Sequence, residues 1–292
     1  AFEEMEGIST AYIEDASDMI HQFDAVAFFL KARYLLNGPP LPWKDYSGLK
    51  VILDHDALQD YCSGFGTRHL GLWTANIPRL GFDLAVVSGN ATASHLSDNG
   101  IDAVTLHKGF AQERFRPLGR TRAGICSFGT PYRARSAMFR TVTNAGIPLV
   151  DSSAPYSDLN ESLNQYQATL VCNMGAEVRW GKLGRAIERY RPGTLLKLIA
   201  APEPMIKNFE AAASGCAVFM DDVEDLDELG FIDGHTAIIY RDFSELIDKL
   251  DYWLSRPSQL ERIGLAAAEL CAERHTWRYR AQQFVHLIES RM

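Results

Sequence analysis

LLKLIAAPEPMIKNFEAAASGCAVFMDD, residues 195–222, is the most informative segment of this sequence. Its apolar start predicts a β-strand over Leu195–Ile199, and Pro204 suits the first turn of a helix because the missing N–H costs nothing there. The alanine run favours helix as far as Ser214, and Gly215 fits the left-handed position that ends a helix. A second strand over Ala217–Met220 follows. The segment therefore predicts a strand, a loop, a helix and a strand in succession.

Short β-branched or aromatic runs alternate with helix-length segments along almost the whole chain. This alternation is typical of α/β proteins built on parallel sheets. The strand-like runs are Ala25–Leu30, Lys50–Asp54, Leu84–Ser88 and Val104–His107, and then Gly124–Phe128, Pro148–Asp151, Thr169–Cys172, Leu195–Ile199, Ala217–Met220 and Ala237–Tyr240. We therefore expect two Rossmann-like domains, of which the first has the smaller sheet.

The domain boundary is predicted near Leu118, where proline and glycine fall between two strand signals. A chain of 292 residues is long enough for two domains, which would be residues 1–118 and 119–292. Apolar residues recur at helical spacing through 246–254, 260–270 and 277–288. The last of these helices is expected to pack back on the N-terminal domain.

Composition excludes several classes of function. Lys and Arg total 29 against 37 for Asp and Glu, and a net charge of −8 would repel nucleic acid. The five cysteines show no CxxC or zinc spacing and are expected to be buried thiols in a reducing cytoplasm. No apolar run approaches the roughly 18 residues of a membrane span, and the acidic start is unlike a signal peptide. We expect a soluble, cytoplasmic protein.

The helix predicted over 204–214 would present N–H groups and its positive dipole end to a ligand such as a diphosphate. Ligands of open α/β sheets bind beyond the carboxyl ends of the strands. Glu203 and Glu210 would lie about 10 Å apart, a separation that could bridge a sugar and a ribose. Lys207 could neutralise phosphate oxygens between them. The alternative is a solvent-exposed helix in which Glu203 and Lys207 form an ordinary ion pair.

The run PMIKNFEAAASGCAVFMDD, residues 204–222, resembles the donor-site motif of GT-B glycosyltransferases of the group 1 type. It is most similar to the branch that includes the spore-maturation proteins. Three other runs resemble family segments: VTLHKGFAQERFRPL at 104–118, FIDGHTAIIYRDFSEL at 231–246 and HTWRYR at 275–280. Two features differ from the family pattern. The glutamates are seven rather than eight residues apart, and a lysine stands where arginine is common, which weakens bidentate phosphate contact.

The resemblance implies a GT-B fold, with two Rossmann-like domains facing a central cleft and the N-terminal one reduced. It implies glycosyl transfer from a nucleoside diphosphate sugar to a hydroxyl on a glycan, a lipid-linked or a small-molecule acceptor, with retention and without a metal or other cofactor. Glu210 would bind the ribose hydroxyls. Lys207 and the helix start, with Met205 and Ile206, would bind the diphosphate. Glu203 or nearby backbone would contact the donor sugar.

Two further site candidates follow strand ends. His55 follows a buried strand, and in resembling enzymes a histidine of the first domain lies near the reacting sugar and stabilises developing charge. In an inverting reaction His55 or a neighbouring aspartate could instead be the general base on the acceptor hydroxyl. The alternative is a histidine bonded to loop carbonyls. Gly129 and Arg135 follow the first strand of the second domain, where phosphates or acceptor would lie. The alternative is an arginine on a solvent-exposed helix start.

Other motifs exclude rival chemistries or leave alternatives open. GFG at 64–66 lacks the third glycine of a nicotinamide site, and adjacent Asp221 and Asp222 would point to opposite faces and chelate a metal poorly. The acidic run 221–228 reads as a solvated loop and helix start. A sugar-nucleotide epimerase and a non-catalytic sugar-nucleotide-binding subunit remain alternatives. Residues 173–195 are an insertion that could cover the cleft, bind acceptor or mediate dimerisation.

Overall fold

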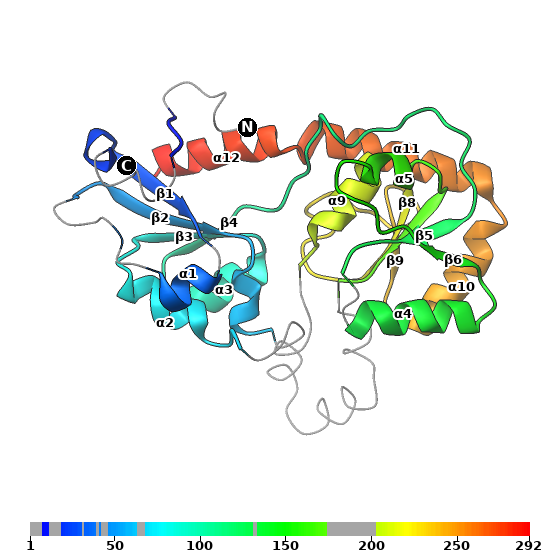
Figure 1. Cartoon of the computed structure of the whole chain (residues 1–292), viewed down its shortest axis with the longest axis horizontal. Coiled ribbons are helices and arrows are strands. Elements are labelled where there is room, and N and C mark those ends of the chain that lie inside the picture. Colours follow the sequence, from blue (N-terminus) through cyan, green and yellow to red (C-terminus); the bar gives the residue numbers. More distant parts are fainter. Residues whose placement is uncertain are drawn as a thin grey trace. The chain divides into compact units, whose positions relative to one another are not determined.

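The computed structural model describes residues 8–11, 19–30, 32–38, 41, 46–62, 68–130, 133–173 and 203–292. The chain divides into two compact units (Figure 1). Unit 1 comprises Ala1–Cys62, Gly66–His107 and Trp277–Met292, and unit 2 comprises Ser63–Phe65 and Lys108–Thr276.

Unit 1 is built on a parallel sheet of four strands in the order β1-β2-β3-β4. Its strands are β1 (Ala25–Phe29), β2 (Leu49–Asp54), β3 (Leu84–Val87) and β4 (Ala103–Thr105). In the register of the sheet, Val51 pairs with both Ala27 and Leu84. The four residues of β3 and the last four of β2 are all buried, as expected of parallel strands that are covered on both faces.

Different segments cover the two faces of this sheet. Because the strand order never reverses, right-handed connections place their helices on the same face. These helices are α1 (Ala32–Asn37), α2 (Leu72–Arg79) and α3 (Asn90–Asp98), with the 3-10 turns Ile20–Gln22 and Ala57–Asp60 nearby in sequence. The C-terminal helix α12 (Trp277–Glu289) covers the other face (Figure 1), where Phe284 and Ile288 pack against Val51, Leu53 and Val86.

Unit 2 is built on a parallel sheet of five strands in the order β6-β5-β7-β8-β9. Its strands are β5 (Ile125–Ser127), β6 (Leu149–Asp151), β7 (Ala168–Val171), β8 (Ala217–Asp221) and β9 (Ile238–Tyr240). Its helices are α4 (Arg133–Asn144), α5 (Leu159–Leu163), α9 (Ile206–Ala213), α10 (Phe243–Leu254) and α11 (Pro257–Arg274). The strand predicted over Leu195–Ile199 and most of the predicted insertion lie outside the described residues.

The strand order of unit 2 reverses at β5, which has β6 on one side and β7 on the other. The chain therefore leaves the carboxyl ends of β5 and β7 in different directions. In open α/β sheets this divergence leaves a crevice in which ligands bind. A ligand site is therefore expected at the residues that follow β5 and β7.

The two units divide between His107 and Lys108 rather than near Leu118. The segment after Lys108 belongs to unit 2 because Phe110 and Phe115 are buried in its core. Asn164 of the same unit accepts a hydrogen bond from the backbone N–H of Leu118 at 2.8 Å. Phe110 and Phe115 precede the proline and glycine that suggested the later boundary, and Leu118 lies between those two residues.

The predicted fold class is confirmed, since both sheets are parallel and alternate with helices. All five cysteines are buried and free, as predicted. Within the described ranges, no helix is long and apolar enough to cross a membrane.

Candidate functional site

The start of α9 is anchored to the carboxyl ends of β7 and β8. Oδ1 of Asn173 accepts hydrogen bonds from the Met205 N–H at 3.1 Å and from Nδ2 of Asn208 at 2.9 Å. The Asn173 N–H in turn donates to Oδ1 of the fully buried Asp221 at 2.6 Å. The first turn of α9 is thereby held at the strand ends, where a ligand would lie.

These bonds also explain why α9 begins at Ile206 and not at Pro204, as the sequence predicts. Met205 is extended (φ −81°, ψ 159°) and is the N-cap of the helix. The helix end is as predicted, because Gly215 has a left-handed φ of 82°. The Met205 N–H donates to Asn173, and the Asn208 N–H of the first turn donates to the Met205 carbonyl oxygen at 3.0 Å.

Glu203 precedes the helix, and the distance inferred from helical spacing does not apply to it. Its side chain is fully buried and forms an ion pair with Lys108, with 2.5 Å between Nζ and Oε1. The ordinary helical pair of Glu203 with Lys207 is replaced by this longer-range contact. The donor-sugar role of Glu203 stays a prediction.

Lys207, in the first turn of α9, lies against Gly129, which follows β5. A Cβ atom at Gly129 would be 2.5 Å from Cε and 2.7 Å from Nζ of Lys207, so a side chain there would displace the end of the Lys207 side chain. Gly129 also has a left-handed φ of 91°. Burial and the nearby positive charge of Arg135 lower the pKa of Lys207. The structure therefore brings together predicted residues from either side of the crevice.

Arg135 is buried on α4 and is not a solvent-exposed residue of a helix start. Its Nε donates to Oγ of Ser127 at 3.2 Å, and its guanidinium also donates to the carbonyl oxygen of Gly129. An ion pair of 3.0 Å joins it to Asp151 at the end of β6. These contacts hold a positive charge directly behind the loop that carries Gly129. The Arg133 side chain lies outside the described residues.

We expect Gly129→Ala to destabilise the protein by about 2 kcal/mol, because alanine is strained at this φ and the new methyl group would displace the buried end of the Lys207 side chain. The matched control is Gly146→Ala: Gly146 has a φ of 80° and nothing within 4 Å of an added Cβ. That variant should lose only about 1 kcal/mol. Urea unfolding of both variants measures the difference. Equal losses would show that the close contact with Lys207 carries no energetic weight.

Glu210 lies in the middle of α9 and is 4% exposed. Burial raises the pKa of its carboxyl group to about 7, although a hydrogen bond with Tyr156 and the charge of Lys207 act in the opposite direction. Such a carboxylate suits the hydroxyl groups of a sugar, which would be its hydrogen-bond donors. Glu210, Lys207 and Arg135 thus form one electrostatically linked group in unit 2.

Three residues of this site were not predicted from the sequence. Asn173 follows a predicted strand directly, so its polar side chain at a strand end was a usable signal. Lys108 and Tyr156 carried no such signal. Their contacts with Glu203 and Glu210 join residues far apart in the chain.

His55 lies in unit 1, directly after β2. Its ring stacks on the indole of Trp277, with centroids 5.4 Å apart and planes 12° from parallel. The ring of Phe29 meets the imidazole edge-on, with 5.8 Å between the ring centroids. The His55 carbonyl oxygen accepts a hydrogen bond of 3.2 Å from the Ser88 hydroxyl. Aromatic neighbours therefore hold the imidazole in place. Its role at a reacting sugar stays a prediction.

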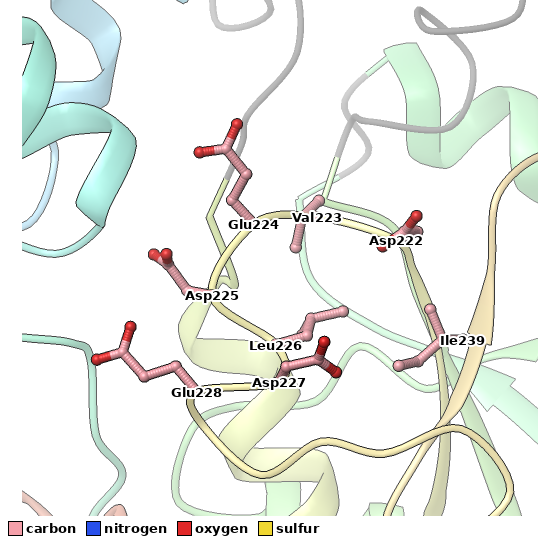
Figure 2. A pocket seen from close by; sticks show the side chains of 8 residues that line it. All are labelled: Asp222, Val223, Glu224, Asp225, Leu226, Asp227, Glu228 and Ile239. Carbon is pink, nitrogen blue, oxygen red and sulfur yellow. The ribbon is translucent and has the colours of Figure 1, made fainter.

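A hollow of about 330 Å³ lies against the turn that follows β8 (Figure 2). It is lined by Asp222, Val223, Glu224, Asp225, Leu226, Asp227, Glu228 and Ile239. Figure 2 shows that the carboxylates diverge, and the described part of the chain has no group of three or more His, Cys, Asp or Glu side chains that could hold a metal ion. A concentration of negative charge would repel a diphosphate. The helix start predicted in this run is wrong, because turns follow the strand. Asp221 is also buried, whereas the run was predicted to be solvated.

A family model and several solved structures are similar to this chain. Residues 149–286 match the family model described as glycosyl transferase-like, and no curated protein sequence matches the chain. Sucrose-phosphate synthase from Thermosynechococcus elongatus has a TM-score of 0.59 at 13% identity, over 98% of this chain and 82% of that one. HepE from Anabaena, in complex with UDP and glucose, has a TM-score of 0.61 at 12% identity, over 95% and 81%.

A third similar structure is TarM from S. aureus, solved with Fondaparinux, alpha-GlcNAc-glycerol and UDP. Its TM-score is 0.59 at 8% identity, over 83% of this chain and 51% of that chain. At these identities the structural matches establish the fold alone.

Proposed function

We propose that this chain transfers a sugar from a nucleoside diphosphate sugar to an acceptor hydroxyl, because residues 149–286 match the glycosyl transferase-like family model and the chain has a GT-B fold. The observation that carries the proposal is the group of Lys207, Arg135 and Glu210 around the start of α9. Two similar structures contain UDP, so a UDP-sugar is the first donor to test.

In this proposal the diphosphate occupies the crevice between the ends of β5 and β7. Lys207 and the first N–H groups of α9, from Ile206 onward, face its oxygens. Arg135 adds positive charge from behind Gly129, to whose carbonyl oxygen it donates. Glu210 accepts hydrogen bonds from the ribose hydroxyls. The diphosphate thus lies against the positively charged groups of the site, and the ribose lies against the Glu210 carboxylate.

The chemical step breaks the bond between the sugar and the diphosphate, which gains negative charge as it leaves. Lys207 and the helix dipole stabilise that charge in the transition state, and groups already fixed in place need no reorganisation. Retention of configuration follows if the acceptor oxygen bonds to the sugar on the face that the diphosphate leaves. The hydroxyl proton then passes to an oxygen of the departing diphosphate, so no protein base is required. His55 is proposed to stabilise charge on the sugar. The buried, free thiols suit the reducing cytoplasm.

A thermal-shift screen against UDP, dTDP, GDP, ADP and CMP tests the donor site. A ligand at about 100 times its dissociation constant stabilises the folded state by about 2.7 kcal/mol. We expect a shift with one diphosphate and a dissociation constant about 30-fold higher in Glu210→Ala, because a buried carboxylate that accepts two hydroxyl groups is lost.

The matched control for this variant is Glu161→Ala, because Glu161 is an exposed residue of the same unit that pairs with Arg120. It should bind the nucleotide like the unmodified protein. The absence of a shift with any nucleotide would contradict the donor-site assignment.

A further inference from the structure

Two buried asparagines form a linked pair at the start of α9. Asn173 follows the carboxyl end of β7, and Asn208 is the third residue of the helix. Oδ1 of Asn173 accepts hydrogen bonds from Nδ2 of Asn208 at 2.9 Å and from the Met205 N–H at 3.1 Å. Each amide group is therefore held through one of its two polar atoms.

The other polar atom of each amide group is buried without a hydrogen bond. Both side chains are 0% exposed, and within the described part of the chain neither Nδ2 of Asn173 nor Oδ1 of Asn208 has a hydrogen-bond partner. A buried polar group without a partner is destabilising, and it is uncommon in folded proteins unless a bound group completes it. The pair therefore indicates a place where a ligand is bound.

The two atoms define the chemistry of that ligand. Nδ2 is a donor and Oδ1 is an acceptor, so the ligand must both accept and donate hydrogen bonds, as a hydroxyl group does. The bond of 2.9 Å between the amides keeps Nδ2 of Asn173 and Oδ1 of Asn208 within about 7.5 Å, which neighbouring hydroxyls of one sugar ring can span. A phosphate group has only acceptor oxygens when ionised, so it would leave Oδ1 of Asn208 without a donor.

We propose that Asn173 and Asn208 bind hydroxyl groups of the transferred sugar and so determine which donor sugar the enzyme accepts. The inference rests on the proposed function, in which Glu210 binds the ribose further along α9. Asn173 instead bonds the N-cap residue Met205, on the side of the helix start from which Glu203 comes. Of the two sugars in the donor, the transferred one therefore lies against the asparagines.

The test is isothermal titration calorimetry with UDP and with a panel of UDP-sugars, including deoxy analogues of the sugar that binds most tightly. It compares the unmodified protein with Asn208→Leu, which removes the buried acceptor without adding charge and leaves the bond between Asn173 and Met205 in place. The matched control is Asn160→Leu. Asn160 is also a buried asparagine of unit 2, but its Oδ1 accepts hydrogen bonds from the Ser214 hydroxyl at 2.9 Å and from the Arg116 N–H at 3.1 Å.

We expect Asn208→Leu to bind the UDP-sugar about tenfold more weakly or worse, while its affinity for UDP stays within about twofold of normal. For the unmodified protein, at least one deoxy analogue should bind about tenfold more weakly than its parent sugar, because the asparagines then stay unpaired. Asn208→Leu should lose this discrimination, since the hydroxyl and the asparagine act as one pair. Asn160→Leu should lower the melting temperature and keep the normal ratio of the two affinities.

Equal weakening of UDP and UDP-sugar by Asn208→Leu overturns the inference, because that result indicates a ribose contact or a purely structural role. Unchanged binding also overturns it and leaves the pair to an ordered water molecule. If Asn208→Leu does not fold, the deoxy series with the unmodified protein decides, and equal binding of all analogues contradicts the inference. If the unmodified protein binds no nucleoside diphosphate and no UDP-sugar, the proposed function fails as well, so UDP binding by this protein separates the two failures.

Discussion

Replacement of Lys207 with methionine is expected to lower kcat for sugar transfer about 100- to 1000-fold. Lys207 is the cation of the first turn of α9, and in the proposed reaction it stabilises the charge that the diphosphate gains as it leaves. That charge is greater in the transition state than in the bound donor, so the loss should fall on kcat more than on KM. Methionine keeps most of the length of the lysine and removes only its charge.

The measurement is the release of UDP from a panel of UDP-sugars, with kcat and KM determined for each variant. Lys249→Met is the matched control, because Lys249 is a partly exposed lysine of α10 that forms ion pairs with Asp233 and Glu245. The control should keep kcat close to that of the unmodified protein. A folded Lys207→Met enzyme within about threefold of normal kcat would exclude a transition-state role for this charge.

Lys108→Met should reduce the free energy of unfolding by about 3 to 5 kcal/mol. The Lys108 ammonium lies 2.5 Å from the carboxylate of Glu203, which is fully buried, and the pair is screened little by solvent. Its removal leaves the buried carboxylate without that cation, which costs far more than the loss of a surface pair. The effect should include the start of α9, because Glu203 stands shortly before the N-cap Met205.

Urea unfolding of Lys108→Met, of the double variant with Glu203→Met and of Lys249→Met measures this effect. The double variant should recover much of the loss, because no charge then remains buried without its partner. Lys249→Met, which loses ion pairs to partly exposed carboxylates, should cost about 1 kcal/mol or less. If Lys108→Met cost no more than this control, the pair would contribute little to stability.

Much of the fold could be read from local pattern. The strands of both sheets occur where β-branched and aromatic runs predicted them, apart from the one that lies outside the described residues. The stop of α9 at Gly215 was also predictable, because a single residue determines whether a left-handed backbone is tolerated. Each of these features depends on the backbone preferences of a few neighbouring residues, so it can be predicted from the local sequence.

The beginning of α9 was not predictable in the same way. Pro204 is compatible with a first helical turn, but Asn173 accepts the Met205 N–H and holds that residue extended. The competing hydrogen bond comes from another strand end. A long-range contact therefore overrides a local preference, as side chain to backbone bonds commonly do at helix starts.

The residue types of the donor site were evident in the sequence, as were the glycine turn beside them and the strand ends at which they lie. Only folding determines which groups become partners, because pairs such as Lys108 with Glu203 are separated by 95 residues and meet when β-strands and helices pack. Burial then alters their chemistry: it raises the pKa of Glu210 and lowers that of Lys207 by removing water from both. Local sequence encodes secondary structure through backbone preference, whereas partners and ionisation depend on desolvation and on distances that exist only in the tertiary structure.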